Sequence, residues 1–336
     1  MNSQPRSQLD SRSHPQGKAV GWLARVRLAM GMVVGMGIVI LSVFAGGCGS
    51  GGKGEVVVYA AQDQVYAEPL FAQFTRETGI RVRVLYDSEA VKTVGLANRL
   101  LAERSRPVCD VFWGNEELRT RQLESSEVWR EDNPWVAFGC RSRRLVVNTN
   151  LVAASGVPRS LLELTNRQWA GKVVFAYPLF GTTATHFLAL EQHWGRELWR
   201  GWCERMAANH PLIVDGNSVA ARMVARGEAV IGLTDSDDFR SEVGQGAPLR
   251  MLPLMPELLL IPNTAAVVRG CPNPAGAQAL VEFLSGQRVG QALVDAGALD
   301  LAAFPRGRMG TLEPEWPALV ADLEASSEFL KRTFLR

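Results

Sequence analysis

The feature that most constrains the fold is an alternation of short apolar runs with segments of helical spacing. Glu55–Ala60, Arg81–Tyr86 and Val108–Trp113 each have the length and composition of a β-strand. Between them, Tyr66–Thr78 and Ala90–Arg104 place apolar residues at helical intervals. A series of strand, helix, strand, helix and strand predicts a parallel sheet covered by helices.

The pattern restarts at about residue 141. Further strands are predicted at Arg143–Asn148, Lys172–Tyr177, Leu212–Asp215 and Ala229–Leu233, and helices at Leu161–Trp169, Gly181–His193, Trp194–Ala208 and Ser218–Arg226. Extended segments at Pro248–Pro256 and Leu258–Val268 return to the first unit, followed by helices at Pro274–Leu284, Gln287–Ala296 and Trp316–Leu335. We therefore predict an α/β protein of two lobes, residues 55–140 with 255–336 and residues 141–254, with two crossing segments and a cleft between them.

Length and composition agree with two globular domains. The chain has 336 residues, of which 47% are hydrophobic and 21% charged. The formal net charge of +2 is misleading, because five basic residues lie in the first 47 positions: Arg6, Arg12, Lys18, Arg25 and Arg27. Without that segment the balance is slightly acidic, which gives no electrostatic case for nucleic acid. The four histidines have no metal-ligand spacing, which argues against a zinc site.

The N-terminal segment predicts export. A basic head ends at Arg27, Leu28–Phe44 carries no charge, and small residues precede Cys48. The segment resembles a bacterial lipoprotein signal, which implies cleavage after residue 47, lipidation of Cys48 and a flexible glycine-rich linker over 48–54. An uncleaved membrane anchor is the alternative, because the apolar run is about one span long. Both interpretations place the body outside the cytoplasm, in the periplasm, and tether it to the membrane.

Four further cysteines remain in the body: Cys109, Cys140, Cys203 and Cys271. In an oxidising compartment they permit two disulfides, whose pairing the sequence does not determine. Buried free thiols are the alternative.

The segment Gly227–Phe239 is the first candidate site. A buried strand, Ala229–Leu233, is followed by Asp235, and Asp237 and Asp238 then open a helix. Ligands of open α/β sheets lie beyond the carboxyl ends of the strands, so three carboxylates at this point can form a site. The alternative is that aspartate is favoured there as a cap and by the helix dipole.

Other polar loops follow predicted strands in the same way. Each can be explained by capping or turn chemistry, but five of them, six with the Asp-rich segment, at corresponding strand ends exceed what caps require. The candidate ligand-binding residues are Asp63, Gln64, Ser88, Asn115, Glu116, Gly181, Thr182, Thr183, Asn217, Ser218, Asp235, Asp237 and Asp238.

The order and spacing of several short motifs, taken together, carry a family resemblance over most of residues 55–300. The motifs are Val-Val-Val-Tyr-Ala-Ala-Gln-Asp63, Phe-Thr-Arg-Glu-Thr-Gly-Ile80, Cys-Asp-Val-Phe-Trp113, Arg-Ser-Arg-Arg-Leu-Val-Val147, Asn-Ser-Val219 and the Gly-Glu228 that leads into the Asp-rich strand end. The chain resembles the periplasmic ferric-ion-binding proteins, solute-binding components of ABC transporters. The resemblance implies a type II periplasmic-binding-protein fold, two lobes of mostly parallel sheet that close about a hinge. It also implies a monomer that is not an enzyme and that delivers its cargo to a membrane permease.

The resemblance does not preserve the iron ligands. The family typically binds Fe(III) through a His, a Glu and two adjacent tyrosines. Here the His place falls at Asp63, the Glu place at Asn115 or Glu116, and the tyrosines at Asp237 and Asp238. A metal set of Asp63, Glu116, Asp237 and Asp238 offers only oxygen ligands, which suit a hard cation, ferric or divalent.

The companion anion site of the family is better preserved. Phe180-Gly181-Thr182 occupies the turn at a helix N-terminus, where N–H groups lack intrahelical partners, and Asn217 matches an Asn of that site. Together with the aspartates, this predicts a ligand with an acceptor-rich end and a donor-rich or cationic end. The candidates are a metal with a phosphate-like anion and an organic solute such as a phosphonate or sugar phosphate. An extracytoplasmic metal-dependent enzyme and a sensor for a signalling receptor are the alternatives.

The sequence also predicts the surroundings of a tryptophan, a basic run and a histidine. Trp113 is expected to pack in the core or the hinge and, of the tryptophans, to be the one that borders the cleft, because it ends a strand beside Asn115. The basic run Arg141–Arg144 is expected to be a solvated loop at a crossover between the lobes. His186 is expected to be a cap or packing residue rather than a catalytic base.

Overall fold

The computed structural model describes residues 54–86, 94–132, 135–254, 256–305, 307 and 310–335. They belong to one compact unit, Gly51–Arg336. The signal segment 1–47, Cys48, the linker up to Lys53 and Ser88 lie outside the described residues, so what the sequence predicts for them stays a prediction. Within the described ranges, no helix combines the length and the apolar character that crossing a membrane requires.

The first lobe contains the predicted parallel unit. Strand β1 (Glu55–Ala60) pairs in parallel with β2 (Arg81–Tyr86) and with β3 (Val111–Gly114). The helices of this part of the chain are α1 (Gln64–Thr78), α2 (Val94–Ala102) and α3 (Glu117–Ser125). Gly79 ends α1 in the left-handed conformation at φ 76°, as expected of a glycine C-cap. Helix α3 was not predicted from the sequence.

The second lobe repeats this arrangement. Strand β5 (Val173–Ala176) pairs in parallel with β6 (Leu212–Val214) and β7 (Ile231–Asp235). Its helices are α4 (Gly181–Trp194), α5 (Arg196–Ala208), α6 (Asn217–Ala225) and α7 (Ser236–Gly244), preceded by a 3-10 turn η2 (Ala154–Gly156). The helix predicted over Leu161–Trp169 is instead two 3-10 turns, η3 (Leu161–Thr165) and η4 (Arg167–Trp169).

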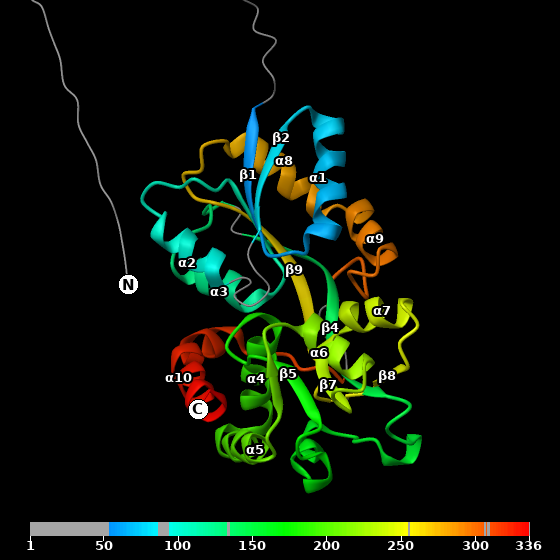
Figure 1. Ribbon diagram of the computed structural model, residues 1–336. Coiled ribbons are helices and arrows are strands. Elements are labelled where there is room, and N and C mark those ends of the chain that lie inside the picture. The colour runs from blue at the N-terminus through cyan, green and yellow to red at the C-terminus, as the bar shows by residue number, and fades with distance from the viewer. Residues whose placement is uncertain are drawn as a thin grey trace, which may run out of the picture. The chain divides into compact units, whose positions relative to one another are not determined.

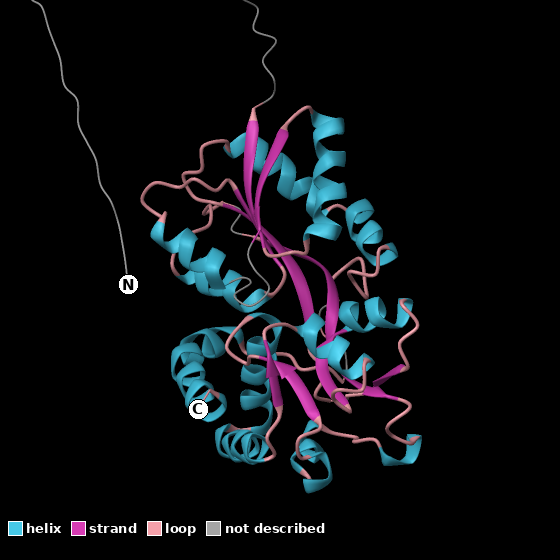
Figure 2. Ribbon diagram, viewed as in Figure 1, coloured by secondary structure: helices cyan, strands magenta, loops and turns pink. Residues whose placement is uncertain are grey.

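Two long strands run through both lobes, and Figure 2 shows them as a continuous band between the two halves. The first part of β4 (Val136–Asn148) pairs antiparallel with β9 (Leu260–Val267), and its second part pairs antiparallel with β7 and β8 (Leu249–Leu252). The sheet order is β2-β1-β3-β9-β4-β7-β5-β6, with β8 beside β4. The parallel strands of each lobe are therefore as predicted, and the crossing strands add antiparallel pairs.

Each lobe has its own hydrophobic core. Helices α8 (Pro274–Ser285) and α9 (Gln287–Asp295) contribute Leu280 and Leu293 to the core around β1 and β3. Helix α10 (Trp316–Phe334) belongs to the other core, although the sequence analysis placed all of 255–336 in the first lobe. Its Phe334 packs edge-on against Phe175 of β5, at 5.6 Å between ring centroids, and Figure 1 shows α10 beside α4 and α5. Burial of this apolar face decides where the helix packs.

Two expectations about buried side chains are resolved by the structure. Cys109, Cys140, Cys203 and Cys271 are all buried free thiols, so the disulfide alternative is not realised. Trp113 is fully buried, with its ring 5.6 Å from that of Phe71 in an edge contact, so the expectation that it borders the cleft is wrong.

Candidate functional site

A cavity of about 60 Å³ lies where residues of both lobes meet. Asp63 and Asn115 line it from the first lobe, Arg141 lines it from β4, and Asp237 and Asp238 line it from α7. The volume is several times smaller than that of pockets for drug-sized ligands, roughly 300–1,000 Å³. The cavity therefore suits an ion or a ligand of a few heavy atoms.

Asp235 lines this cavity, and its carboxylate, which we call the floor of the site, accepts hydrogen bonds from several side chains. It is the last residue of β7 and the N-cap of α7, and its carboxylate accepts hydrogen bonds from Arg143 Nη1 at 2.7 Å and Arg141 Nε at 3.1 Å. The Thr182 hydroxyl adds a third bond, at 2.8 Å. Burial alone would raise the pKa of Asp235, but Arg143 and Arg141 outweigh it and hold the pKa below its usual value. Asp235 is thus an ionised structural group.

The two arginines that hold Asp235 were not found by sequence reasoning. Arg141 and Arg143 are 3% and 0% exposed, so the expectation of a solvated loop is wrong. Both lie in β4, two positions apart, and therefore project to the same face of the strand. Ser142 projects to the other face, where its hydroxyl bonds to Asp300. Buried guanidinium groups require such carboxylate partners, since an unpaired buried charge is costly.

Asp237 and Asp238 occupy the first turn of α7 and have the opposite environment. Burial raises the pKa of Asp237 to about 7; Arg141 opposes this increase, whereas Asp235 and Asp63 add to it. Burial also raises the pKa of Asp238 well above its usual value, and the neighbouring Asp237 adds to the shift. Asp235, Asp237 and Asp238 each offer an oxygen within 4.8 Å of the others. Like charges held this closely in a partly dry site favour a cationic ligand.

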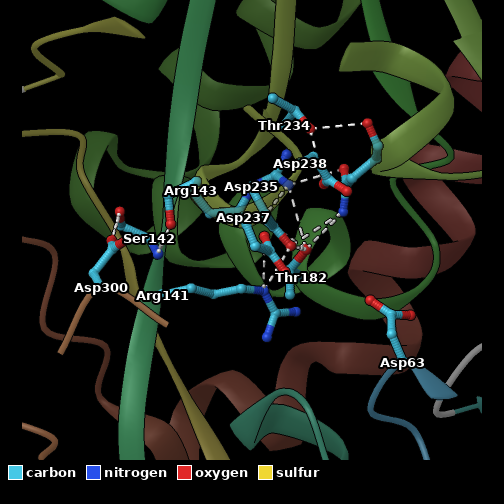
Figure 3. Close-up of polar contacts among 12 residues, drawn as sticks. Asp63, Arg141, Ser142, Arg143, Thr182, Thr234, Asp235, Asp237, Asp238 and Asp300 are labelled. Carbon is cyan, nitrogen blue, oxygen red and sulfur yellow. Dashed lines mark hydrogen bonds and ion pairs between the residues drawn. The ribbon is translucent and has the colours of Figure 1, made fainter. Parts of the chain in front are cut away.

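The start of α4 lies on the same cavity and is tied to α6. Asn217, the first residue of α6, donates to the Thr182 hydroxyl at 2.9 Å and accepts from Thr183 at 3.1 Å and from Arg143 at 2.9 Å. These side chains are therefore engaged with one another. The first-turn N–H groups of a helix have no partner within the helix, so the backbone from Gly181 onward supplies the donors for an acceptor-rich ligand. Figure 3 shows Thr182 beneath Asp235 and Asp237, with Asp63 on a separate segment.

Some residues predicted for the site do not reach it. Glu116 is buried as the N-cap of α3, where its carboxylate accepts from Leu118 N at 2.6 Å, Arg119 N at 3.0 Å and the Thr185 hydroxyl at 3.0 Å. Both of its oxygens are used for capping, which corrects its assignment as a ligand or metal residue.

Gln64 and Ser218 also lie apart from the cavity. Gln64 is exposed and donates to Glu68 along α1 at 2.6 Å. Ser218 lines a separate depression of about 220 Å³, which Asp238 also lines. The structure thus brings together Asp63, Asn115, Gly181, Thr182, Thr183, Asn217, Asp235, Asp237 and Asp238.

His186 is a packing residue, as expected. It is fully buried on α4, and its Nε2 lies 2.8 Å from the backbone oxygen of Glu257. Burial and the nearby Arg143 lower its pKa to about 3, so the imidazole stays neutral.

Two lobes joined by long strands, with a small polar cavity at their junction, define a binding protein of the two-lobed periplasmic type. Residues 55–298 match the family model described as bacterial extracellular solute-binding protein, and the chain belongs to this family. Members of such a family capture solutes and do not convert them, so the chain is a binding protein and not an enzyme, as predicted.

Relatives and solved structures agree with this assignment. The major ferric iron-binding protein of Neisseria meningitidis serogroup A is 24% identical over 264 residues, which cover 71% of this chain and 78% of the relative. The crystal structure of iron-bound HitA from Pseudomonas aeruginosa superposes with a TM-score of 0.72 at 20% identity, over 83% of this chain and 99% of that one. AfuA from Actinobacillus pleuropneumoniae, with fructose-6-phosphate bound, gives 0.70 at 18% identity, over 84% and 97%. These structures share the type II periplasmic-binding fold.

Proposed function

We propose that this chain is the extracytoplasmic solute-binding component of an ABC importer, anchored through a lipidated Cys48. It closes its lobes on a small ligand with a positive centre and delivers the ligand to a membrane permease. The family match and the relatives named as ferric iron-binding proteins support the transport role. The lipoprotein-like residues before Cys48 support the anchor.

The observation that carries the proposal is the environment of Asp237 and Asp238. Two neighbouring carboxylates at the cavity wall face Asp63 from the other lobe, and Arg141 offsets part of their charge. A ligand cation placed among them relieves this repulsion, and it does so most strongly when both lobes contribute. Closure on a cation is therefore favoured by the site itself.

A metal cation with an anion is the first candidate cargo. Asp237 and Asp238 are the carboxylates of the Asp235, Asp237 and Asp238 cluster that two arginines do not already hold, and hard cations such as Fe(III) prefer such oxygen ligands. The relatives from Neisseria and the protein of Serratia marcescens named Fe(3+)-binding periplasmic protein support this candidate. The anion would take the first-turn N–H groups of α4.

An organic solute that carries both an oxyanion and a positive centre is the second candidate. The bound fructose-6-phosphate in AfuA indicates that this fold also accommodates phosphorylated solutes. In the present chain, Arg141 lines the cavity beside the start of α4, which adds a cationic donor for such a group.

Calorimetric titration and thermal denaturation test the proposal. The full-length protein, extracted in mild detergent, is titrated with ferric citrate, ferric ion with phosphate, divalent metals, phosphonates and sugar phosphates. A bound ligand at a hundredfold excess over its Kd stabilises the protein by about 2.7 kcal/mol. The double variant Asp237→Asn, Asp238→Asn is expected to lose this gain.

The matched control is Asp322→Asn, which alters an exposed ion pair between Asp322 of α10 and Arg196. It is expected to behave like the parent. If the double variant keeps the full ligand-induced stabilisation, or if no ligand with a positive centre binds, the proposed function fails.

A further inference from the structure

Two buried charged groups on the cavity wall each have an atom without a hydrogen-bond partner in the part of the chain that the structure describes. They are a donor, Arg141 Nη1, and an acceptor, Asp237 Oδ1. Both residues are more than nine-tenths buried and line the same cavity. Arg141 Nε lies 3.6 Å from Asp237 Oδ1, beyond hydrogen-bond distance, so the two groups attract each other without satisfying each other. Native proteins rarely leave buried charged groups unpaired, and a bound ion or ligand is one explanation where two of them line the same cavity.

The position of Arg141 also favours an organic cation over a metal ion. Asp235 is already neutralised by two guanidinium groups, which leaves Asp237 and Asp238 as the available carboxylates of the cluster. A di- or trivalent metal bound to them would lie within a few ångströms of the Arg141 charge, and the repulsion there is strong. An ammonium group carries a single charge and three N–H donors, which match carboxylates arranged on several sides.

Resting on the proposed function, we propose that the cargo is a small zwitterion that carries a primary ammonium group and an oxyanion. Asp237 and Asp238 hold the ammonium, and Asp63 closes over it from the first lobe. Arg141 Nη1 and the first-turn N–H groups of α4 hold the oxyanion. The cavity of about 60 Å³ limits the spacer between the two groups to a few carbon atoms. Figure 3 shows the guanidinium of Arg141 directed away from the aspartates that its Nε contacts, toward the side where Asp63 lies.

The aspartates of the site therefore recognise the ammonium end of one molecule, and Arg141 with the start of α4 recognises its oxyanion end. The raised pKa of Asp237 agrees with this arrangement, because an ammonium among the carboxylates would stabilise their ionised forms. Recognition by both halves at once also explains how the site discriminates against simple amines and simple anions, each of which would leave one buried group unpaired.

Calorimetry with whole and half ligands tests the inference on the unmodified full-length protein in mild detergent. The probes are 2-aminoethylphosphonate, β-alanine, ethylphosphonate and ethylamine, with ferric citrate as the metal probe. One of the two zwitterions is expected to bind at least 100-fold more tightly than both half ligands, and the phosphonate and carboxylate arms identify the oxyanion. Binding of either half ligand as tightly as the zwitterions would overturn the inference.

Ferric citrate separates this inference from the proposed function. Saturable binding of ferric citrate with no binding of either zwitterion would overturn the zwitterion and leave the proposed function standing. Binding of ethylphosphonate alone would overturn both, because no positive centre would then be needed.

Two variants test which residue binds the ammonium group and which binds the oxyanion. Asp237→Asn is expected to weaken zwitterion binding by roughly 10- to 100-fold, since it removes one charged hydrogen-bond partner, and not to weaken the binding of ethylphosphonate. Arg141→Lys is expected to weaken the zwitterion similarly and to leave ethylamine unchanged. Asp322→Asn and Arg196→Lys, in an exposed ion pair, are the matched controls. An equal loss of affinity for every probe would indicate a damaged fold instead of lost contacts and would contradict the assignment. The comparison of whole and half ligands on the unmodified protein needs no variant and remains decisive in that case.

Discussion

Aspartates have opposite environments at two places in the cavity, which we call its floor (Asp235) and its mouth (Asp237 and Asp238). On the floor, Asp235 is bonded to Arg141, Arg143 and Thr182, and its pKa is lowered. At the mouth, two to three residues further along, Asp237 and Asp238 have raised pKa values and few partners. The floor is therefore part of the folded structure, whereas we propose that the mouth binds a ligand.

The largest effect is expected from the floor. Asp235→Asn removes the charge that compensates two buried arginines and should lower the free energy of unfolding by about 3–5 kcal/mol. Urea denaturation without ligand measures it, with Asp322→Asn as the control. A loss below about 1 kcal/mol would contradict the view that Asp235 is a structural ion-pair residue.

The mouth should respond in the opposite way. Asp237→Asn with Asp238→Asn removes two repelling carboxylates, so stability without ligand at pH 8 should stay equal or rise by about 1 kcal/mol. Ligand affinity should fall by roughly 100-fold, about 2.7 kcal/mol. Calorimetry and urea denaturation of the same samples provide both numbers. Strong destabilisation of the ligand-free variant would mean that mouth and floor do not differ.

The pH dependence follows from the raised pKa of Asp237. Its pKa is about 7 when folded against 3.8 in the reference state, so the folded protein binds more protons between these values. The contribution of this group to stability is therefore complete below about pH 4 and is lost as the pH rises through about 7. Relative to Asp237→Asn, the ligand-free parent should lose about 2 kcal/mol between about pH 5 and 7. A parent that gains stability over this interval relative to the variant would contradict the assignment.

The smallest effect is expected for an ion pair that holds α7, the helix that carries Asp237 and Asp238. Arg240 of α7 forms an ion pair with Asp300, which also accepts from the Ser142 hydroxyl. Asp300→Asn should lower stability by only about 1 kcal/mol, since the pair is partly exposed, and should weaken ligand binding a few-fold by loosening α7. Denaturation and titration of this variant measure both changes. A loss of binding as large as that of the mouth variants would make Asp300 part of the ligand site.

Much of this arrangement could be predicted from the sequence, because it depends on local patterns. Apolar runs followed by turn residues located β7, α4 and α7, and hence the aspartates and the threonines of the cavity. The ferric-binding resemblance correctly indicated the two-lobed fold.

The parts that escaped prediction depend on contacts between distant positions. Arg141 and Arg143 are tolerated inside β4 only because Asp235, more than ninety residues away, lies beside them. A basic run considered alone is typical of a solvated loop, so no local signal showed their burial. Likewise, the apolar face of α10 did not indicate which core would bury it, and the capping of α3 by Glu116 required knowing that a helix begins there.

A crystal structure of the protein grown with the tightest-binding probe tests most directly whether the aspartates bind the positive centre of the ligand. We expect the positive centre of the ligand within hydrogen-bond distance of Asp237 and Asp238, with Asp63 approaching from the first lobe. Ligand bound instead in the larger cavity lined by Trp135 and Trp316, with the aspartates unchanged, would contradict it.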